Sequence, residues 1–471
     1  MSGKTDLHWT GRVAGFAGAR YLAIIQAVEA AIANGELKEG DRLPPQRELA
    51  ERLDLNIGTV THAYAEMQKS GRIRGEVGRG TFINRMEGPD GPTTLWDHSV
   101  RTDFVDLSHN FPAQIGPHPA AELIMAELCA PLDFPGLLAA QNDAGLETHR
   151  RAASDWLGRF GVRAMADDIL VTCGAQHGLM LALGALTRPG DIALTEEYAF
   201  YGLKSAAAMM GRSLVGVRMD QEGIIPDVLE NACRRTGARV LFCTPTLHNP
   251  TTATMSLGRR NEIVQICERY DVTIVEDDVY GFMPEPAPAP LSALAPDRAV
   301  HVSSISKLVG PGLRIGFLAA PRRYVHAFGV ALRASTLMAS PINAEWAARL
   351  VRSDAIDGII DAVRTETAAR QAIVLANLPK DSVVSNSAAF YFRLKLRNDW
   401  TGEAFARAAE ANGVGVTPFG VFDVGAMHDS DSVRVCVNAA PDRTTLKHAL
   451  WQLSELLNDG APEPVRMGRH V

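Results

Sequence analysis

The chain has 471 residues, of which 46% are hydrophobic and 21% are charged, a balance typical of globular proteins that bury large cores. A chain of this length is expected to form two or three domains. The formal net charge of −7 excludes a protein that is basic overall, but it leaves room for a small DNA-binding domain on an acidic body.

The six cysteines form no C-x-x-C pair and lie in apolar or strand-like surroundings. We therefore expect reduced thiols, with neither disulfides nor a metal site. The N-terminus has no apolar core of a signal peptide, and no run approaches the length needed to span a membrane. These observations predict a cytoplasmic protein without a membrane segment.

The first part of the chain, residues 1–84, predicts three helices followed by a hairpin. Apolar residues at helical spacing indicate a helix over 21–34, and a turn at 40–45 leads into a second helix over 46–53. Asn56 is placed to cap a third helix over 58–69. Residues 73–83 alternate around glycines, as hairpins do. This order predicts a winged helix-turn-helix domain of α+β type.

In such a domain the third helix can enter the major groove of DNA. The side chains expected to reach bases or phosphates are Asn56, Thr59, Thr61, His62 and Tyr64 near this helix, Arg47 on the second helix, and Gly78, Arg79 and Gly80 at the wing. These 84 residues hold 11 Lys and Arg against 10 Asp and Glu. Because this near-neutral charge is weak for a DNA binder, a small protein-interaction domain is the alternative.

The motif Leu43-Pro44-Pro45-Gln46-Arg47-Glu48-Leu49-Ala50 and the wing Gly78-Arg79-Gly80-Thr81-Phe82 resemble the GntR family of bacterial transcription regulators. The resemblance covers the whole head and implies a double-stranded DNA operator as the partner. Many relatives carry an arginine early in the recognition region, where this chain has Ile57 and Gly58, so their base preference does not transfer.

Residues 85–104 are rich in Gly and Pro and are predicted to form a linker. From about residue 145, helical and strand-like runs alternate through the body, residues 105–460. Strands are predicted at 169–172, 191–194, 240–243 and 273–275, and helices at 150–160, 175–186, 201–210 and 258–270. This alternation predicts an α/β body with a mostly parallel sheet. A small α+β domain is expected over about 345–460, followed by a tail at 461–471.

Polar residues follow the predicted strands, where ligands bind in sheets of this kind. Gly174, Ala175 and Gln176 open a helix and could cradle an anion, while Phe200, Asn249, Asp277 and Tyr280 could stack on or bond to a planar ring. Taken singly, each could be an ordinary strand–helix turn, a core aromatic or a solvated loop.

Lys307 lies between strand-like runs at 299–302 and 315–319, among small hydroxyl and glycine residues. A buried amine with a lowered pKa can form a Schiff base with an aldehyde cofactor. Ser304, Ser306 and Arg314 would supply donors for a phosphate. Alone, the stretch could equally be an ordinary surface lysine beside a glycine loop.

Together, these residues resemble the fold-type-I aminotransferases, the aspartate aminotransferase class, over about residues 105–450. The resemblance implies pyridoxal 5′-phosphate bound as an aldimine of Lys307. It places Asp277 on the pyridine nitrogen, Asn249 and Tyr280 on the ring hydroxyl oxygen, Phe200 on the ring face, and Gly174, Ala175, Gln176, Ser304 and Arg314 on the phosphate. Arg434, in an apolar strand, would bind a ligand carboxylate.

A GntR-type head on an aminotransferase-like body resembles the MocR subfamily of GntR regulators. This implies a homodimeric, pyridoxal-phosphate-dependent, sequence-specific transcriptional regulator that senses an amino compound through the Lys307 aldimine. Residues 140–143 lack the tyrosine usual in aminotransferases, which favours a sensor over an efficient enzyme. An active aminotransferase with a DNA-binding head is the alternative, and a scaffold without cofactor is a third interpretation.

Overall fold

The computed structural model describes residues 8–15, 20–33, 36–38, 40–69, 73–76, 80–83, 104–113, 115, 119–128, 134–397, 399–425 and 431–460. The chain divides into two compact units, Met1–Asp90 and Gly91–Val471. The predicted linker up to residue 103, the tail at 461–471 and the wing residues Gly78 and Arg79 lie outside the described residues.

The N-terminal unit contains a short 3₁₀ helix, three α-helices and a small sheet. Its elements are η1 (His8–Gly15), α1 (Arg20–Ala33), β1 (Arg42–Leu43), α2 (Gln46–Leu53), α3 (Ile57–Lys69), β2 (Ile73–Glu76) and β3 (Gly80–Ile83). The three strands pair antiparallel in the order β1-β3-β2, which forms the predicted wing. This unit is a winged helix-turn-helix domain.

Apolar residues at helical spacing explain why these helices pack together. Ile24 of α1, Leu49 of α2 and Val60 and Met67 of α3 are fully buried in one core. Asn56 Oδ1 accepts a hydrogen bond from the backbone N–H of Gly58 at 2.8 Å, so α3 begins with the predicted side-chain cap. Burial of these apolar side chains is the main favourable contribution to the stability of the unit.

The body is built on a seven-stranded sheet in the order β5-β13-β12-β11-β10-β6-β7. The strands are β5 (Ile169–Thr172), β6 (Ile192–Glu196), β7 (Ser213–Val217), β10 (Val240–Cys243), β11 (Thr273–Asp277), β12 (Ala299–Ser304) and β13 (Gly316–Ala319). Only β13 runs antiparallel to its neighbours, and the other pairs in this sheet are parallel. The prediction of a mostly parallel α/β sheet is confirmed.

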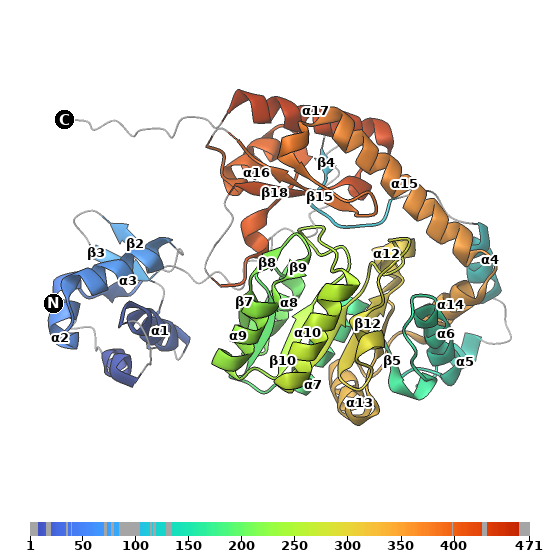
Figure 1. Ribbon diagram of the computed structural model, residues 1–471, viewed down its shortest axis with the longest axis horizontal. Helices are drawn as coiled ribbons and strands as arrows, with labels where there is room; N and C mark the ends of the chain where they lie inside the picture. The colour runs from blue at the N-terminus through green and yellow to red at the C-terminus, as the bar shows by residue number, and fades with distance from the viewer. Residues whose placement is uncertain are drawn as a thin grey trace. The chain divides into compact units, whose positions relative to one another are not determined.

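Helices cover both faces of this sheet (Figure 1). One face packs against α9 (Pro226–Thr236), α10 (Leu257–Arg269) and α11 (Leu291–Leu294), and the other against α7 (Ala175–Leu186), α8 (Tyr201–Met209) and α13 (Arg322–Thr336). A third core joins one edge of the sheet to α4 (Pro119–Leu128), α5 (Phe134–Leu138), α6 (Glu147–Gly158) and α14 (Pro341–Arg352). The short strands β8 (Met219–Asp220) and β9 (Gly223–Ile224) form a separate hairpin. Because the strands of the large sheet are covered on both sides, their sequences are continuous apolar runs.

A second, smaller subdomain follows along α15 (Ile356–Asn377). Its sheet has the order β14-β15-β18-β17, formed by β14 (Val383–Val384), β15 (Tyr391–Lys395), β18 (Ser432–Cys436) and β17 (Thr417–Pro418), with α16 (Gly402–Ala411) and α17 (Arg443–Asp459) packed on it. β16 (Val414–Gly415) pairs in parallel with β4 (Val105–Asp106), from the other end of the body. The first half of α15 packs in the core of the large sheet and its end packs in the small subdomain, as its course in Figure 1 shows.

Several predicted bounds agree with the structure residue for residue, including β5, α7 and β10. The predicted start of the small domain near residue 345 falls within α14, which packs in the core of the large sheet, whereas the core of the small subdomain draws on the end of α15, through Ile373 and Val374. The five described cysteines are free. Every helix in the described part of the chain is too short or too polar to cross a membrane.

Candidate functional site

Lys307 lies in α12 (Ser306–Val309), a single turn that follows the end of β12. Its amine donates a hydrogen bond to the backbone oxygen of Asn110 and lies 5.8 Å from the centre of the Tyr280 ring. Burial lowers the pKa of Lys307 to about 8, and the positive charges of Arg434 and Arg314 act in the same direction. A substantial fraction of this amine is therefore neutral near pH 8, which a nucleophile requires.

Asp277 is the last residue of β11. It is far from Lys307 in sequence but lies at the same edge of the sheet, because β11 and β12 are parallel neighbours. Burial and the neighbouring carboxylate of Asp278 raise the pKa of Asp277 to about 7, while Lys307 and His301 oppose the shift. Its Oδ1 is buried without a hydrogen-bond partner among the described residues. A carboxylate in this condition would gain from a cationic donor.

Asn249, Tyr280 and Arg434 converge beside this pair. Arg434 is 1% exposed, and its Nη1 donates to Asn249 Oδ1 at 2.9 Å. The hydroxyl of Tyr280 accepts a hydrogen bond from the carboxamide of Asn110, and burial raises the pKa of Tyr280 well above its ordinary value. The structure thus brings Asn249, Tyr280 and Arg434 together with Lys307, although they come from separate parts of the chain.

The guanidinium of Arg434 has both apolar and polar contacts. It lies 4.8 Å from the centre of the Phe422 ring, and its Nη2 donates to the backbone oxygen of Ser108 at 2.5 Å and to Thr417 Oγ1 at 3.2 Å. Its Nε is buried and unpartnered within the part of the chain that the structure describes. One donor of Arg434 therefore remains for an anionic ligand.

The predicted phosphate cradle forms at the start of α7. Gly174 precedes this helix with φ of +87°, and a Cβ there would lie 3.0 Å from Arg314 Nη2. Arg314 Nη2 donates to the backbone oxygen of Cys173 at 3.0 Å, which holds the guanidinium next to the first N–H groups of α7, those of Ala175 and Gln176. Free N–H groups at a helix start and a nearby arginine are suited to a phosphate.

The two serines next to Lys307 differ in their roles. The Ser304 hydroxyl donates to the backbone oxygen of Ile315 at 2.8 Å and accepts from the backbone N–H of Ser306 at 3.1 Å. Ser306 Oγ is buried without a hydrogen-bond partner in the described ranges. The Ser304 hydroxyl, predicted to donate to a phosphate, therefore already donates within the chain. The Ser306 hydroxyl is free to donate to a phosphate.

Phe200 and Gln176 lie side by side. Phe200 precedes α8 and is half-buried, and Gln176 Nε2 donates to the backbone oxygen of Gly202 at 2.9 Å. A Cβ at Gly202 would collide with Gln176 Oε1 and Phe200 Cε1, so both side chains rest against this glycine. Gly202 is a supporting residue that the sequence reasoning did not identify.

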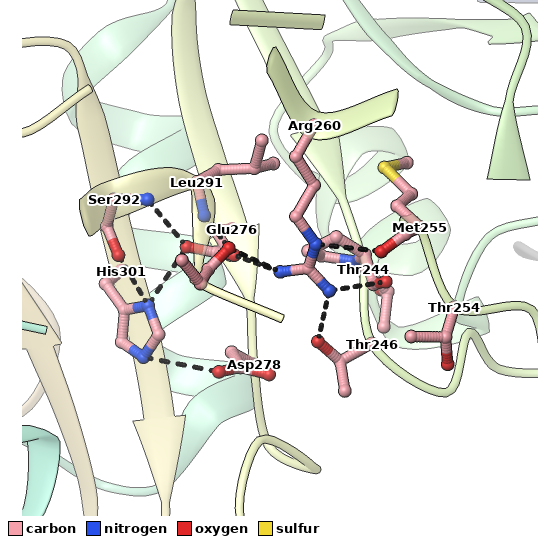
Figure 2. A network of polar contacts seen from close by, with 12 residues as sticks. Thr244, Thr246, Thr254, Met255, Arg260, Glu276, Asp278, Leu291, Ser292 and His301 are labelled. Carbon is pink, nitrogen blue, oxygen red and sulfur yellow. Dashed lines mark hydrogen bonds and ion pairs between the residues drawn. The ribbon is translucent and has the colours of Figure 1, made fainter. Parts of the chain in front are cut away.

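Behind Asp277, a buried polar network supports the sheet edge (Figure 2). Glu276 accepts hydrogen bonds from the N–H groups of Leu291 at 2.9 Å and Ser292 at 3.0 Å, and Arg260 Nη1 lies 3.7 Å from it. His301 Nδ1 lies 3.1 Å from Glu276 and its Nε2 lies 3.8 Å from Asp278. The network therefore places the cations of Arg260 and His301 next to the carboxylates that flank Asp277 in sequence.

These contacts fix the charge states in the network. Burial opposes the charged form of His301, but its hydrogen bond to Glu276 and the charges of Glu276 and Asp278 raise its pKa overall. Burial likewise opposes ionisation of Glu276, yet its bond to His301 and the charge of Arg260 lower its pKa. Removing either cation would leave Glu276 buried with only one cationic partner, and removing His301 would also take the cation from Asp278.

In the head, the residues predicted to contact DNA differ in exposure and in their hydrogen bonds. Arg47 and His62 are exposed, and the ring of His62 lies 4.4 Å from that of Tyr21. Thr61 Oγ1 is exposed but donates to Gln46 Oε1 at 2.8 Å, and Thr59 is half-buried. Asn56 caps α3. Gly80 begins β3 with φ of +124°, a backbone conformation that favours glycine, and a Cβ there would displace the exposed Arg42 guanidinium.

Tyr64 does not fit its predicted place among the exposed residues of α3. It is 3% exposed, and its hydroxyl donates to the backbone oxygen of Pro44 at 2.7 Å. This bond ties α3 to the turn before α2, so Tyr64 stabilises the head. In the structure, Tyr64 lies on the inner face of α3, in the same core as Val60 and Met67.

Comparison with known proteins agrees with this division of the chain. The family model "Aminotransferase class I and II" matches residues 102–453, and "Bacterial regulatory proteins, gntR family" matches residues 20–83. The "Uncharacterized HTH-type transcriptional regulator YdeF" of Bacillus subtilis is 29% identical over 93% of this chain and 94% of its own length. The "HTH-type transcriptional regulator TauR" of Rhodobacter capsulatus is 31% identical over 67% of this chain and 70% of its length.

Solved structures with the same fold match the body. An archaeal alanine:glyoxylate aminotransferase has a TM-score of 0.71 at 22% identity and covers 76% of this chain and 91% of its own. The α-aminoadipate aminotransferase LysN of Thermus thermophilus, complexed with N-(5′-phosphopyridoxyl)-L-leucine, has a TM-score of 0.70 at 22% identity, over 76% of this chain and 92% of its own. At 22% identity, these similarities establish the fold of the body and nothing about its activity.

Proposed function

Given that the chain belongs to the aminotransferase class I and II family and carries a GntR-type DNA-binding head, we propose that it is a pyridoxal-phosphate-dependent regulator of the MocR type that responds to an amino compound. A relative matched over 93% of this chain, and therefore over both parts, is named a transcriptional regulator, as are two relatives matched over 67% and 63% of it, and the coarse function is that of a DNA-binding regulator. The cofactor and the amino compound are proposed from the arrangement of the residues around Lys307.

One observation supports the cofactor above the others: four buried polar atoms around Lys307 have no hydrogen-bond partner among the described residues. They are Asp277 Oδ1, Ser306 Oγ, Arg434 Nε and Asn110 Oδ1. Buried polar groups are nearly always paired, and each unpaired one costs roughly 1–3 kcal/mol. A ligand with a protonated ring nitrogen and anionic groups would pair with several of them, and pyridoxal 5′-phosphate has these features.

The residues fit the parts of this cofactor. Asp277 would hold the ring nitrogen, Asn249 and Tyr280 the ring hydroxyl oxygen, and Phe200 one face of the ring. Gly174, Ala175, Gln176, Ser306 and Arg314 would hold the phosphate, with Ser304 supporting Ser306. When bound, the cofactor supplies an aldehyde that captures primary amines, and Lys307 is the amine of this chain that would carry it.

For the amino compound, Arg434 supports an anionic group, such as a carboxylate, in the ligand. Its Nη groups are held by Asn249, Ser108 and Thr417, which fixes the guanidinium plane and leaves Nε available. A pre-oriented guanidinium loses little entropy when it binds a carboxylate. The ligand class we propose is therefore a primary amine that carries an acidic group.

We also propose that the protein acts as a cytoplasmic homodimer on double-stranded DNA. A regulator of this type acts where the chromosome lies, and two heads would bind two half-sites. Large apolar side chains are exposed on the body at Leu123 and Met125 of α4 and at Leu138 of α5, with exposed fractions of 60%, 47% and 63%. We propose that these exposed side chains take part in the contact between the two copies.

The second candidate is an active aminotransferase that carries a DNA-binding head. The neutral fraction of Lys307 near pH 8 favours it, because a lysine that moves protons needs a pKa close to the working pH. Single-turnover experiments with a panel of amino acids distinguish the two. Complete and fast conversion of the cofactor to its amine form supports the enzyme, and slow or absent conversion with a change in DNA binding supports the sensor.

The proposal is tested by reduction of the purified protein with borohydride in the presence of pyridoxal 5′-phosphate. We expect a pyridoxyl adduct on the peptide that contains Lys307, and no adduct on that peptide in Lys307→Ala. Lys447→Ala, which removes an exposed lysine of α17, is the matched control and keeps the adduct. Absence of the adduct from the wild-type protein, or effector-dependent DNA binding that persists in Lys307→Ala, contradicts the proposal.

A further inference from the structure

Asn110 lies where the chain enters the body, in residues 104–113, and sequence reasoning gave this segment no role. The segment is fixed on two sides by backbone hydrogen bonds. The N–H of Leu107 donates to the backbone oxygen of Gly415 at 2.9 Å, and the N–H of Cys436 donates to that of Leu107 at 2.8 Å. Leu107 is fully buried in the core of the small subdomain. Asn110 follows three residues later, so its position is set by these anchors.

Further contacts hold residues 104–113 next to Arg434 and Thr417. The backbone oxygen of Ser108 accepts hydrogen bonds from Arg434 at 2.5 Å and from Thr417 Oγ1 at 3.2 Å. Ser108 Oγ and its N–H donate to Asp106 Oδ1 at 2.5 and 2.9 Å, which closes a tight turn. The turn directs the following residues over the ends of β11 and β12.

Three polar groups of Asn110, its backbone oxygen and both carboxamide atoms, lie within the site. Its backbone oxygen accepts from the amine of Lys307, and its Nδ2 donates to the hydroxyl of Tyr280. Its Oδ1 is buried and has no hydrogen-bond partner in the residues that the structure describes. Asn110 therefore contacts both Lys307 and Tyr280. Its carboxamide oxygen remains free to accept a hydrogen bond from a ligand.

We propose that Asn110 is a positioning residue of this site: its backbone oxygen holds the Lys307 amine, its carboxamide nitrogen orients the Tyr280 hydroxyl, and its free carboxamide oxygen receives an N–H of the incoming amino compound. The last part rests on the proposed function. The first two parts describe contacts of the chain alone and stand without the cofactor. The carboxamide of Asn412, by contrast, donates within its own helix end, to the backbone oxygen of Ala408 at 2.8 Å.

The electrostatic surroundings make Lys307 a sensitive probe of this position. The titratable and charged groups that face its amine are Asp277 from β11, Arg434 and the Cys436 thiol from β18, and Arg314 from the loop before β13. Tyr280 adds its ring and hydroxyl. A carboxylate introduced at residue 110 would join this set close to the same partners, and an opposite charge so close raises the pKa of an amine.

The first experiment uses the full-length protein without cofactor. The rate of acetylation of Lys307 by acetic anhydride is followed against pH by peptide mass spectrometry, for wild type and Asn110→Asp. The substitution keeps the shape of the side chain, and we expect the midpoint of the profile to rise by about one pH unit. At pH 8 the labelling rate would then fall about fivefold. Asn412→Asp makes the same change at an exposed site of the small subdomain and leaves the profile unchanged.

A second variant covers the case in which Asn110→Asp does not fold. Asn110→Ala, Tyr280→Phe and the double variant are compared for the affinity of pyridoxal 5′-phosphate, read from its absorption band. If the carboxamide acts through the Tyr280 hydroxyl, each single change weakens binding about tenfold and the double variant is no weaker than either. Losses that multiply to about one-hundredfold in the double variant overturn the proposal.

The free oxygen is tested with methylamine, a probe that has no carboxylate for Arg434. We expect Asn110→Ala to slow the methylamine-dependent change of the absorption band about tenfold, while the reduced adduct on Lys307 still forms. An unchanged rate, or an acetylation profile equal to that of the wild type, overturns the role of Asn110. Absence of any adduct in the wild-type protein instead defeats the proposed function, and the acetylation profile still decides whether Asn110 positions Lys307.

Discussion

The buried carboxyl of Asp277 costs stability, and under the proposed function it would strengthen cofactor binding; replacing it with asparagine should separate the two. In the cofactor-free protein, the pKa of Asp277 is raised from 3.8 to about 7, chiefly by burial and by the charge of Asp278. A raised carboxyl pKa means that the folded state resists ionisation. The resulting loss of stability is absent below pH 4, grows as the pH rises and is complete above pH 7.

The size of this effect follows from the shift. Three pKa units correspond to about 4 kcal/mol, and asparagine recovers only part of this because its buried carboxamide oxygen would also lack the partner that Asp277 Oδ1 lacks. We therefore expect cofactor-free Asp277→Asn to be more stable than wild type by about 2 kcal/mol at pH 8, and by less than about 1 kcal/mol at pH 5. The substitution keeps the side-chain volume, so no cavity is formed.

The assay is urea denaturation of the full chain at pH 5 and pH 8, followed by tryptophan fluorescence. Asp354→Asn, which changes an exposed carboxylate between α14 and α15, is the matched control and should show no gain. Adding pyridoxal 5′-phosphate should then stabilise the wild type more than Asp277→Asn, because the ring nitrogen would lose its charged partner. A variant that is less stable than wild type at pH 8, or equally stabilised at both pH values, refutes this reasoning.

Three further substitutions test other parts of the structure. Arg260→Leu should destabilise the body by about 3–5 kcal/mol, because it leaves Glu276 buried without its guanidinium partner; urea denaturation measures this. Gly202→Ala should weaken the affinity for pyridoxal 5′-phosphate about tenfold, since its Cβ would displace Gln176, and absorbance titration measures this. Tyr64→Phe should destabilise the head by about 1 kcal/mol, read as a lower melting temperature of the head.

Each of these predictions has a matched control or a result that contradicts it. Arg269→Leu removes an exposed arginine from the same helix as Arg260, and a loss as large as that of Arg260→Leu would count against the buried network. Gly329→Ala adds a methyl group with no atom within 4 Å of it and should leave cofactor affinity unchanged. For Tyr64→Phe, an unchanged head stability would mean that the bond to Pro44 contributes nothing measurable.

The sequence predicted the parts of the fold that depend on local pattern. Short apolar runs such as Val240–Cys243 indicate buried strands, and polar residues directly after them fall at one sheet edge because the strands are parallel. That rule placed Asp277 and Lys307 each at a strand end, the resemblance to the aminotransferases assigned them to one site, and the structure shows that their strands, β11 and β12, are parallel neighbours. The apolar strand around Arg434 likewise indicated a buried arginine, which the structure places beside Asn249.

The residues that were missed depend on contacts between distant parts of the chain. Asn110 reaches Lys307 across 197 residues, through a two-residue strand, β4, whose partner is close to the other end of the body. No periodicity marks so short a strand. Ser304 is not free to bind a phosphate because its hydroxyl donates to the backbone oxygen of Ile315, in the following loop. His301 becomes part of the buried polar network through Glu276, which lies on the neighbouring strand.

The pairing of β4 with β16 joins the first described strand of the body to the small subdomain. The chain that comes from the head enters the body through Val105 and Asp106, and these residues pair with the small subdomain and not with the seven-stranded sheet. Any rotation of that subdomain would carry the anchor of the tether with it. A shortened body that starts after residue 113 would lose β4. It would also lose the backbone oxygen of Ser108, which accepts from Arg434, and that of Asn110, which accepts from Lys307.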